Sequence, residues 1–210
     1  MYLAACYESL VADYAFSSAY AEAIVRALKR SPRAAELEAK LVFEAKTMWD
    51  NPWTEQWQPA EVVERIGDAA VELYGEDVFE NVTFAVMKDR FGPIVLPAIQ
   101  GAVNSKSPGA VFKKLDTLVK VALKGVELQF KPEGELAGRL FVRYPRPVAK
   151  HVVTSWRGVA KFVFEVTSPG EIVHVEQRDP GDVLALTLQW PEPVKPAPKD
   201  AKPAAKPGFK

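Results

Sequence analysis

The sequence predicts an α+β protein in which an N-terminal helical layer packs on a four-stranded antiparallel sheet. Two observations indicate this class. Apolar residues recur at the three-to-four spacing of helices through the first half of the chain. Residues 111–190 then follow the order helix, strand pair, helix, strand pair, and these strands alternate apolar with polar residues, as strands with one buried face do.

Glycine and proline separate the predicted helices of the first half. Gly75 and the pair Gly92-Pro93 each end an apolar stripe, because glycine commonly terminates a helix and proline disrupts its continuation. Asp77 stands where the N-cap of the next helix is expected. The predicted helices span residues 3–28, 32–51, 59–75, 77–91 and 93–103.

The period of the apolar pattern changes twice in the second half. In the last segment Leu184, Leu186, Leu188 and Trp190 all point to one side of a strand. Residues 148–166 are rich in valine, but their apolar stripe keeps helical spacing and favours a helix. The predicted elements are helices over 111–125 and 148–166 and strands over 126–130, 139–144, 171–178 and 183–190.

Three regions are predicted along the chain. Residues 1–57 form an N-terminal helical segment, and residues 58–190 form the α+β domain. Residues 191–210 are nearly all proline, alanine and lysine, so they lack the apolar surface that would offset the entropy of ordering. We expect this tail to be disordered.

Composition and charge exclude several classes of protein. The 27 basic and 27 acidic side chains cancel, so no net charge attracts the chain to nucleic acid. Cys6 is the only cysteine, which excludes an intramolecular disulfide and a thiolate metal cage. No apolar run is long enough to span a membrane, and the first residues lack the features of a signal peptide. We therefore expect a cytoplasmic protein without a bound metal.

Three segments carry a resemblance to known proteins: YGEDVFENVTFAVMKDRFGP at 74–93, RLFVRYPRP at 139–147 and VLALTLQW at 183–190. With the order of elements, they resemble the ligand-binding superfold shared by heme-nitric-oxide-binding domains, 4-vinyl-reductase domains and TRAPP trafficking subunits. Within it, the chain is most similar to a paralogous family of myxobacterial proteins. The resemblance covers residues 58–190. It implies a ligand between helices and sheet, or pairing through the helical faces.

Heme is the first ligand that the resemblance suggests. Heme-nitric-oxide-binding domains use a proximal histidine and a Tyr-x-Ser-x-Arg clamp. The matching stretch here is Tyr-Pro-Arg-Pro-Val at 144–148, where Arg146 replaces the serine and Val148 the arginine. We expect His151 to be solvated beyond the strand and His174 to lie on an exposed strand face. The sequence therefore predicts no cofactor.

An apolar pocket is the second implication, because relatives hold acyl chains or other hydrophobic ligands between the helical layer and the sheet. Aromatic side chains from both layers could line such a pocket, although the same residues would also serve as a filled core. The candidate pocket residues are Phe84, Phe91, Phe112, Phe130, Trp156 and Phe162.

A group of basic residues forms the candidate partner-binding surface. These residues lie on one predicted strand, its exit and the polar side of the following helix, where they could contact an acidic partner or could simply be solvated. The candidate residues are Arg139, Phe141, Arg143, Arg146, Lys150, Arg157 and Lys161.

No catalytic arrangement accompanies these candidates. His151 and Ser155 are one helical turn apart, but no orienting acid or oxyanion-hole motif appears in the sequence. The sequence therefore predicts a non-enzymatic interaction or regulatory module, a scaffold that binds a protein partner or pairs with itself as a dimer. The alternative is a sensor or carrier that holds a small apolar or acyl ligand in the helix–sheet pocket.

Overall fold

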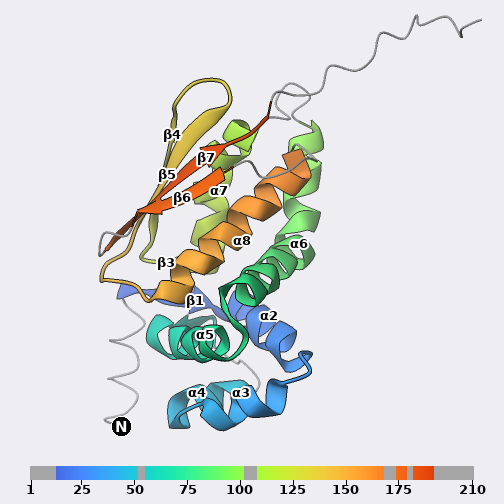
Figure 1. Cartoon of the computed structure of the whole chain (residues 1–210), viewed down its shortest axis with the longest axis vertical. Coiled ribbons are helices and arrows are strands. Elements are labelled where there is room, and N and C mark those ends of the chain that lie inside the picture. Colours follow the sequence, from blue (N-terminus) through green and yellow to red (C-terminus); the bar gives the residue numbers. More distant parts are fainter. Residues whose placement is uncertain (1–12, 52–54, 102–107, 168–173, 179–181, 192–210) are drawn as a thin grey trace, which may run out of the picture.

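A computed structural model describes residues 13–51, 55–101, 108–167, 174–178 and 182–191. The chain has an α+β fold, which confirms the predicted class (Figure 1). The strands form a four-stranded antiparallel sheet and a second, three-stranded antiparallel sheet that the sequence analysis did not include. The boundaries at residues 57 and 190 stay a prediction, and the tail from residue 192 lies outside the described residues.

The larger sheet contains β4 (Glu127–Pro132), β5 (Ala137–Arg143), β6 (His174–Arg178) and β7 (Val183–Gln189) in the order β4-β5-β7-β6. In the central pair, Leu140 lies opposite Leu186 and Val142 opposite Leu184. These four side chains are buried, whereas the residues between them are partly or fully exposed. The alternation read from the sequence therefore identifies the inner face of the central strands correctly.

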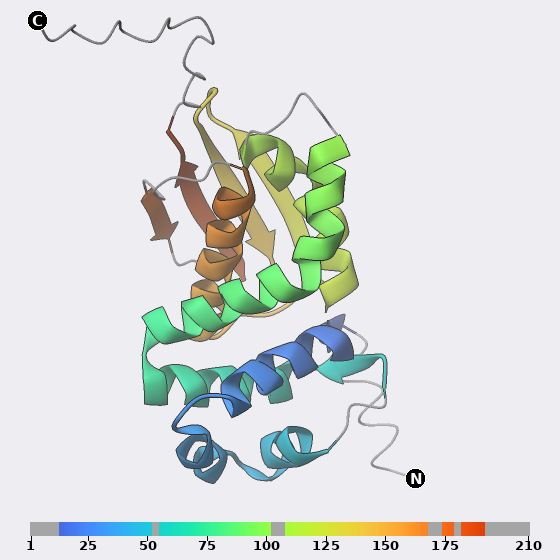
Figure 2. The same cartoon turned by 90° about the vertical axis from the view of Figure 1, so that its right-hand side faces the viewer.

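Three helices lie on the inner side of this sheet: α7 (Pro108–Ala122), α8 (Lys150–Thr167) and α6 (Glu76–Gly101), which packs mainly on α8. Figure 2 shows them on one side of the strands, with the other face of the sheet left uncovered by helices. Both α7 and α8 carry a marked apolar face, and the apolar stripe of α8 is the one that its sequence predicted.

The closest helix contact in this layer lies between α6 and α8 at Gly158. A Cβ atom at this position would stand 2.6 Å from the Glu80 carbonyl oxygen and 2.9 Å from the Thr83 Cβ. Only a residue without a side chain lets the two backbones approach this closely. Gly158 therefore sets the distance between the two helices.

Four helices form a second layer below the sheet and its helices (Figure 1). They are α2 (Ser18–Lys29), α3 (Ala34–Lys40), α4 (Phe43–Asp50) and α5 (Ala60–Tyr74). The helix predicted over 32–51 is in fact two short helices, because Leu41 and Val42 are extended and interrupt the first one. The buried residues of this layer belong to the same hydrophobic core as those of the sheet.

The three-stranded sheet ties the two layers together. It contains β1 (Ala15–Ser17), β2 (Trp57–Pro59) and β3 (Leu123–Lys124) in the order β2-β1-β3. Within the described residues, the first predicted helix is therefore wrong over residues 14–17. Gly125, at a φ of 78°, packs against the chain next to β1, and a Cβ atom there would lie 1.7 Å from the Asp13 carbonyl oxygen.

The two helices predicted on either side of Gly92-Pro93 are one helix, α6. Figure 2 shows that this helix bends sharply along its length. Proline inside a helix removes one backbone hydrogen bond and usually kinks the helix without always ending it. Among the described residues, none of the helices has the length and apolar character that crossing a bilayer requires.

Candidate functional site

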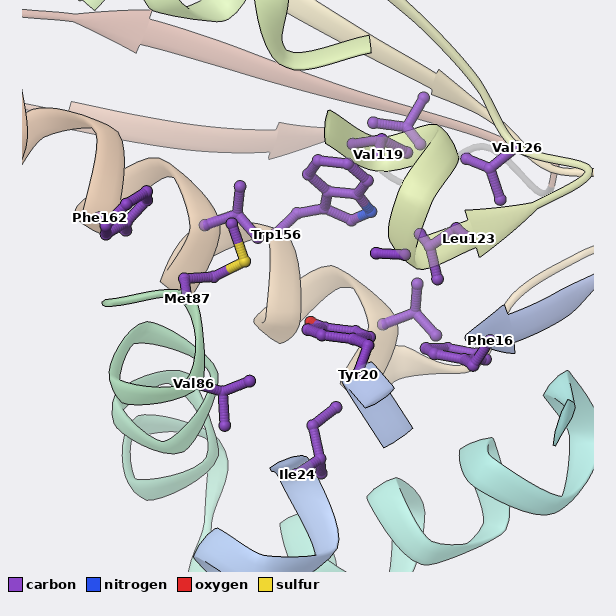
Figure 3. Close-up of a cluster of buried hydrophobic side chains, with 14 of the residues drawn as sticks. Phe16, Tyr20, Ile24, Val86, Met87, Val119, Leu123, Val126, Trp156 and Phe162 are labelled. Carbon is purple, nitrogen blue, oxygen red and sulfur yellow. The ribbon is translucent and has the colours of Figure 1, made fainter. Parts of the chain in front are cut away.

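An interior cavity of about 50 Å³ lies where α2, α5, α6, α7 and α8 meet next to β1. Figure 3 shows Tyr20, Met87 and Trp156, from three different helices, turned toward one another beside Phe16 and Leu123. Its lining is largely apolar and rich in aromatic rings. The aromatic lining residues are Tyr14, Phe16, Tyr20, Phe79, Phe91, Tyr144 and Trp156.

The volume of this cavity limits what it can hold. An engineered apolar cavity of about 150 Å³ accommodates benzene or xenon and stays free of water. The cavity of about 50 Å³ is a third of that size, so it suits a molecule of a few heavy atoms. An acyl chain would require the surrounding side chains to move.

Three buried tyrosines line the cavity, whose lining is largely apolar apart from them, His151 and Ser155. Burial raises the pKa of the Tyr14 hydroxyl well above its ordinary value, and the nearby Tyr144 and Glu64 add to the effect. Burial also raises the pKa of Tyr20 and of Tyr144, although the hydrogen bond from Trp156 opposes the shift at Tyr144. The three phenols therefore stay protonated and can donate hydrogen bonds.

These raised pKa values predict unfolding at alkaline pH. A buried tyrosine keeps its proton while the unfolded chain loses it above a pKa of about 10, so the unfolded state is favoured as pH rises beyond that value. We expect the midpoint of urea unfolding to be steady below this pH and to fall above it. Replacing Tyr20 with phenylalanine should make the fall less steep. A titration of all tyrosine absorbance at about pH 10 without loss of structure would contradict this expectation.

A polar cluster borders the cavity on the side of Tyr14. The indole nitrogen of Trp156 donates a hydrogen bond to the hydroxyl of Tyr144. Arg146 donates to Glu64 Oε2 at 2.6 Å, and its guanidinium carbon lies 5.4 Å from the centre of the Tyr14 ring. The Tyr14 hydroxyl and Glu64 Oε1 are both buried, and the interaction between the two side chains contributes to the raised pKa of Tyr14.

Tyr14 also borders a second, outer hollow. This hollow has a volume of about 310 Å³ and is lined by Tyr14 together with Asp13, Pro59, Ala60, Glu61, Pro145 and Arg146. Tyr14 lines both spaces, so it lies at the boundary between the cavity and the outer hollow.

His151 is buried at the edge of the cavity, with 4% of its surface exposed, so the prediction that it is solvated is wrong. Its Nδ1 lies 2.6 Å from Asp68 Oδ1, and its ring packs edge-on against Phe79. A Cβ atom at Gly67 would stand 2.5 Å from the imidazole, so α5 is shaped around this ring. The Ser155 hydroxyl donates a hydrogen bond to the His151 carbonyl oxygen at 3.1 Å. The hydroxyl proton is therefore already used in a bond to the backbone.

The six predicted pocket residues occupy three different environments. Phe91 and Trp156 line the cavity, whereas Phe112, Phe130 and Phe162 are not among its lining residues. Phe112 stacks on Phe130 with ring centres 5.5 Å apart, deeper in the helix–sheet interface. Phe84 is half-buried between α6 and α8, beneath Lys88 and Lys161. The tyrosines and Phe79, which the sequence analysis did not select, supply much of the actual lining.

The basic residues of the predicted partner-binding surface form ion pairs with several acidic residues of the chain. Lys150 and Arg157 contact Glu76, and Arg157 and Lys161 contact Glu80. The hydrogen bond from Lys150 is the main cause that lowers the pKa of Glu76. Arg146 turns inward to Glu64, as described above.

The remaining members of this predicted surface lie on β5. Arg139 pairs with Glu133 at 2.9 Å. Phe141 is half-buried, and the Lys131 Nζ lies over its ring at a distance of 5.2 Å from the ring centre. Arg143 is exposed and has no ion pair within the described part of the chain. Most of the predicted cations are therefore neutralised by the protein itself.

Comparison with known proteins identifies the fold. No family model matches the sequence, and no curated protein matches it. The structure is similar to an H-NOX mutant from K. algicida, with a TM-score of 0.57, 10% identity and coverage of 84% of this chain and 97% of that one. It is also similar to a double mutant of Tt H-NOX, with a TM-score of 0.55, 16% identity and coverage of 88% and 100%.

A third similar structure is an oxygen-binding H-NOX domain related to soluble guanylate cyclases, in its oxygen complex. The TM-score is 0.51, with 13% identity and coverage of 85% of this chain and 97% of that one. The chain therefore has the fold of H-NOX domains, one of the groups that its sequence resembles. The similarity extends beyond residues 58–190 into the N-terminal layer.

The residues present do not fit a heme. The cavity of about 50 Å³ is far smaller than a macrocycle of four pyrrole rings requires. The imidazole of His151 is held between Asp68 and the backbone at Gly67, and Arg146 is paired with Glu64. Among the described residues, no group of three or more histidine, cysteine, aspartate or glutamate side chains could hold a metal ion.

Proposed function

We propose that this protein is a non-enzymatic sensor or carrier that holds a small apolar molecule directly in the interior cavity, without heme. The observation that carries the proposal is the cavity itself, lined by apolar and aromatic side chains at the junction of five helices. The similar oxygen-binding H-NOX domain binds a diatomic gas, and a dissolved gas is of a size that suits this cavity.

The lining supports a small apolar occupant over a polar one. Aliphatic side chains such as Ile24, Leu115 and Val159 complete the aromatic wall, so the occupant would be held by dispersion contacts and by its exclusion from water. The protonated hydroxyls of Tyr14, Tyr20 and Tyr144 are the available donors to any weak acceptor atom. An acyl ligand, the other possibility that the sequence suggested, is less suitable because the cavity is too small for an acyl chain.

The basic residues selected from the sequence support the partner-binding hypothesis less well. Ion pairs to Glu64, Glu76 and Glu80 already neutralise cations at four of the seven positions, Arg146, Lys150, Arg157 and Lys161. A partner would have to compete with these internal contacts. We therefore favour the ligand hypothesis for the site.

Xenon is a suitable probe of the cavity, because it is apolar, monatomic and reports binding by NMR. We expect saturable chemical-shift changes under xenon pressure for amide groups of residues around the cavity, such as Leu115 and Val119. Ala122 lines the cavity at the end of α7, and Ala122→Val adds two methyl groups there. This variant should lose the xenon response.

Ala39→Val is the matched control, since Ala39 is an exposed helical residue of α3 outside the cavity. It should respond to xenon as the unmodified protein does. The melting temperature gives a second readout, because a methyl group that fills a void costs little, whereas overpacking costs about 1–3 kcal/mol. A xenon response that survives Ala122→Val, or strong destabilisation by this variant, would reject the cavity as a ligand site.

A further inference from the structure

A groove of about 460 Å³ runs on the outside of the molecule between α2 and α6. Its floor and walls are largely apolar, built from alanines of α2 and α6 and from three valines of α6. Val78 at one end is 46% exposed, so the groove presents this aliphatic side chain to solvent. The apolar residues of the groove are Ala23, Ala27, Val78, Val82, Ala85 and Val86.

The rim of the groove carries an excess of positive charge. Arg26 and Arg30 stand on the α2 side and Arg90 on the α6 side, with Asp89 as the acidic residue of the lining. Arg26 pairs with Glu22 at 2.6 Å. Arg30 and Arg90 are exposed and make no ion pair within the described ranges, unlike Arg33, Arg65 and Arg157 on other surfaces.

We propose that this groove is a docking surface for an amphipathic helix with acidic residues, supplied by a partner protein. A helix that lies in a groove between two helices buries residues spaced i, i+3, i+4 and i+7 on the apolar floor. Acidic residues on its flanks would then meet Arg30 and Arg90 on opposite walls. Arginine suits such a contact because its guanidinium group forms bidentate hydrogen bonds with carboxylates.

The two walls of the groove are also walls of the interior cavity. Tyr20 and Ile24 of α2 and Met87 of α6 line the cavity, while residues on the outer side of the same helices line the groove. Val86 lines the groove and the adjacent Met87 lines the cavity, and Figure 3 shows both side chains in the same buried cluster. The docking surface and the cavity are therefore formed by the same two helices, α2 and α6. Docking itself does not depend on a ligand in the cavity.

The test uses the full chain and a designed, fluorescently labelled helical peptide. One version carries leucines at the i, i+3, i+4 and i+7 positions with flanking glutamates, and its counterpart has lysines in place of the glutamates. We expect the acidic peptide to bind at least about tenfold more tightly than the basic one by fluorescence anisotropy, and to bind more weakly as salt increases.

Arg30→Glu combined with Arg90→Glu should weaken the acidic peptide at least about tenfold and strengthen the basic one. Arg143→Glu is the matched control, because Arg143 is also exposed and without an ion pair in the described chain but lies on β5. It should leave binding unchanged, as should Ala122→Val, which alters only the cavity and so separates this proposal from the ligand hypothesis.

Three results would overturn the proposal. The two peptides could bind equally, or Arg143→Glu could weaken binding as much as the groove variant does, which would show nonspecific attraction. Alternatively, sedimentation could show self-association that the Arg30 and Arg90 substitutions abolish. In that case the groove would be occupied by a second copy of this chain.

Discussion

Replacing Gly158 with alanine is expected to lower the free energy of unfolding by about 3 kcal/mol, as severe overpacking does. The added Cβ atom would meet backbone atoms of α6, 2.6 Å from the Glu80 carbonyl oxygen and 3.1 Å from the Phe84 nitrogen. Backbone atoms inside a helix cannot move aside as the end of a flexible side chain can. The helices would have to separate, and the core around Trp156 and Val159 would lose contacts.

Urea unfolding measured by circular dichroism would test this, with Gly109→Ala as a matched control in another helix. A Cβ atom at Gly109 would lie 3.5 Å from the Trp190 ring, which is ordinary van der Waals contact. Alanine also favours the helix by about 0.5–1 kcal/mol over glycine. The control should therefore be neutral or stabilising. A loss of less than about 1 kcal/mol at Gly158 would mean that α6 and α8 are not this close.

Replacing Arg146 with methionine is expected to cost about 3 kcal/mol, because it leaves a buried carboxylate without its partner. The Glu64 side chain is 5% exposed, whereas that of Arg146 is 42% exposed. The carboxylate of this ion pair is therefore much more deeply buried than its guanidinium group. Glu64→Gln should cost less, since the guanidinium group of Arg146 can turn into solvent while the carboxylate of Glu64 cannot.

The double variant Glu64→Leu with Arg146→Met should recover most of the loss, because replacing a buried ion pair with apolar residues is often neutral. Arg139→Met is the surface control, since Arg139 and Glu133 are 46% and 41% exposed and such pairs contribute about 0–1 kcal/mol. Unfolding free energies of these four variants form the measurement. A cost at Arg146 no larger than at Arg139 would show that solvent reaches Glu64.

Local patterns in the sequence account for most of the observed elements. The spacing of Leu184, Leu186 and Leu188 predicts a strand with one inner face, and the stripe through Val152 and Trp156 predicts α8. The strands that were missed, β1 and β3 among them, have three residues or fewer and owe their pairing to distant segments. The division of α6 at Gly92-Pro93 was wrong because tertiary packing can hold a helix through a proline kink.

The candidate site depends on contacts that the sequence pattern does not contain. Glu64 and Arg146 are 82 residues apart, and Asp68 and His151 are 83 apart. Of the predicted pocket residues, Phe91 and Trp156 line the cavity. Tyr14 and Tyr20 lie at the other end of the chain, and periodicity alone assigns them to a helix without indicating what they face. Only the three-dimensional fold brings these residues together.

The position of Tyr14 at the boundary of the inner cavity and the outer hollow has a kinetic consequence for the proposed ligand. If a ligand occupies the cavity, its exit toward the hollow would require the phenol ring to turn away from Arg146, whose guanidinium carbon is 5.4 Å from the ring centre. Gly125 packs on the Asp13 carbonyl group, so the adjacent backbone has no room to withdraw. For such a ligand, the size of the cavity would govern affinity, whereas the movement of Tyr14 would govern residence time along this path.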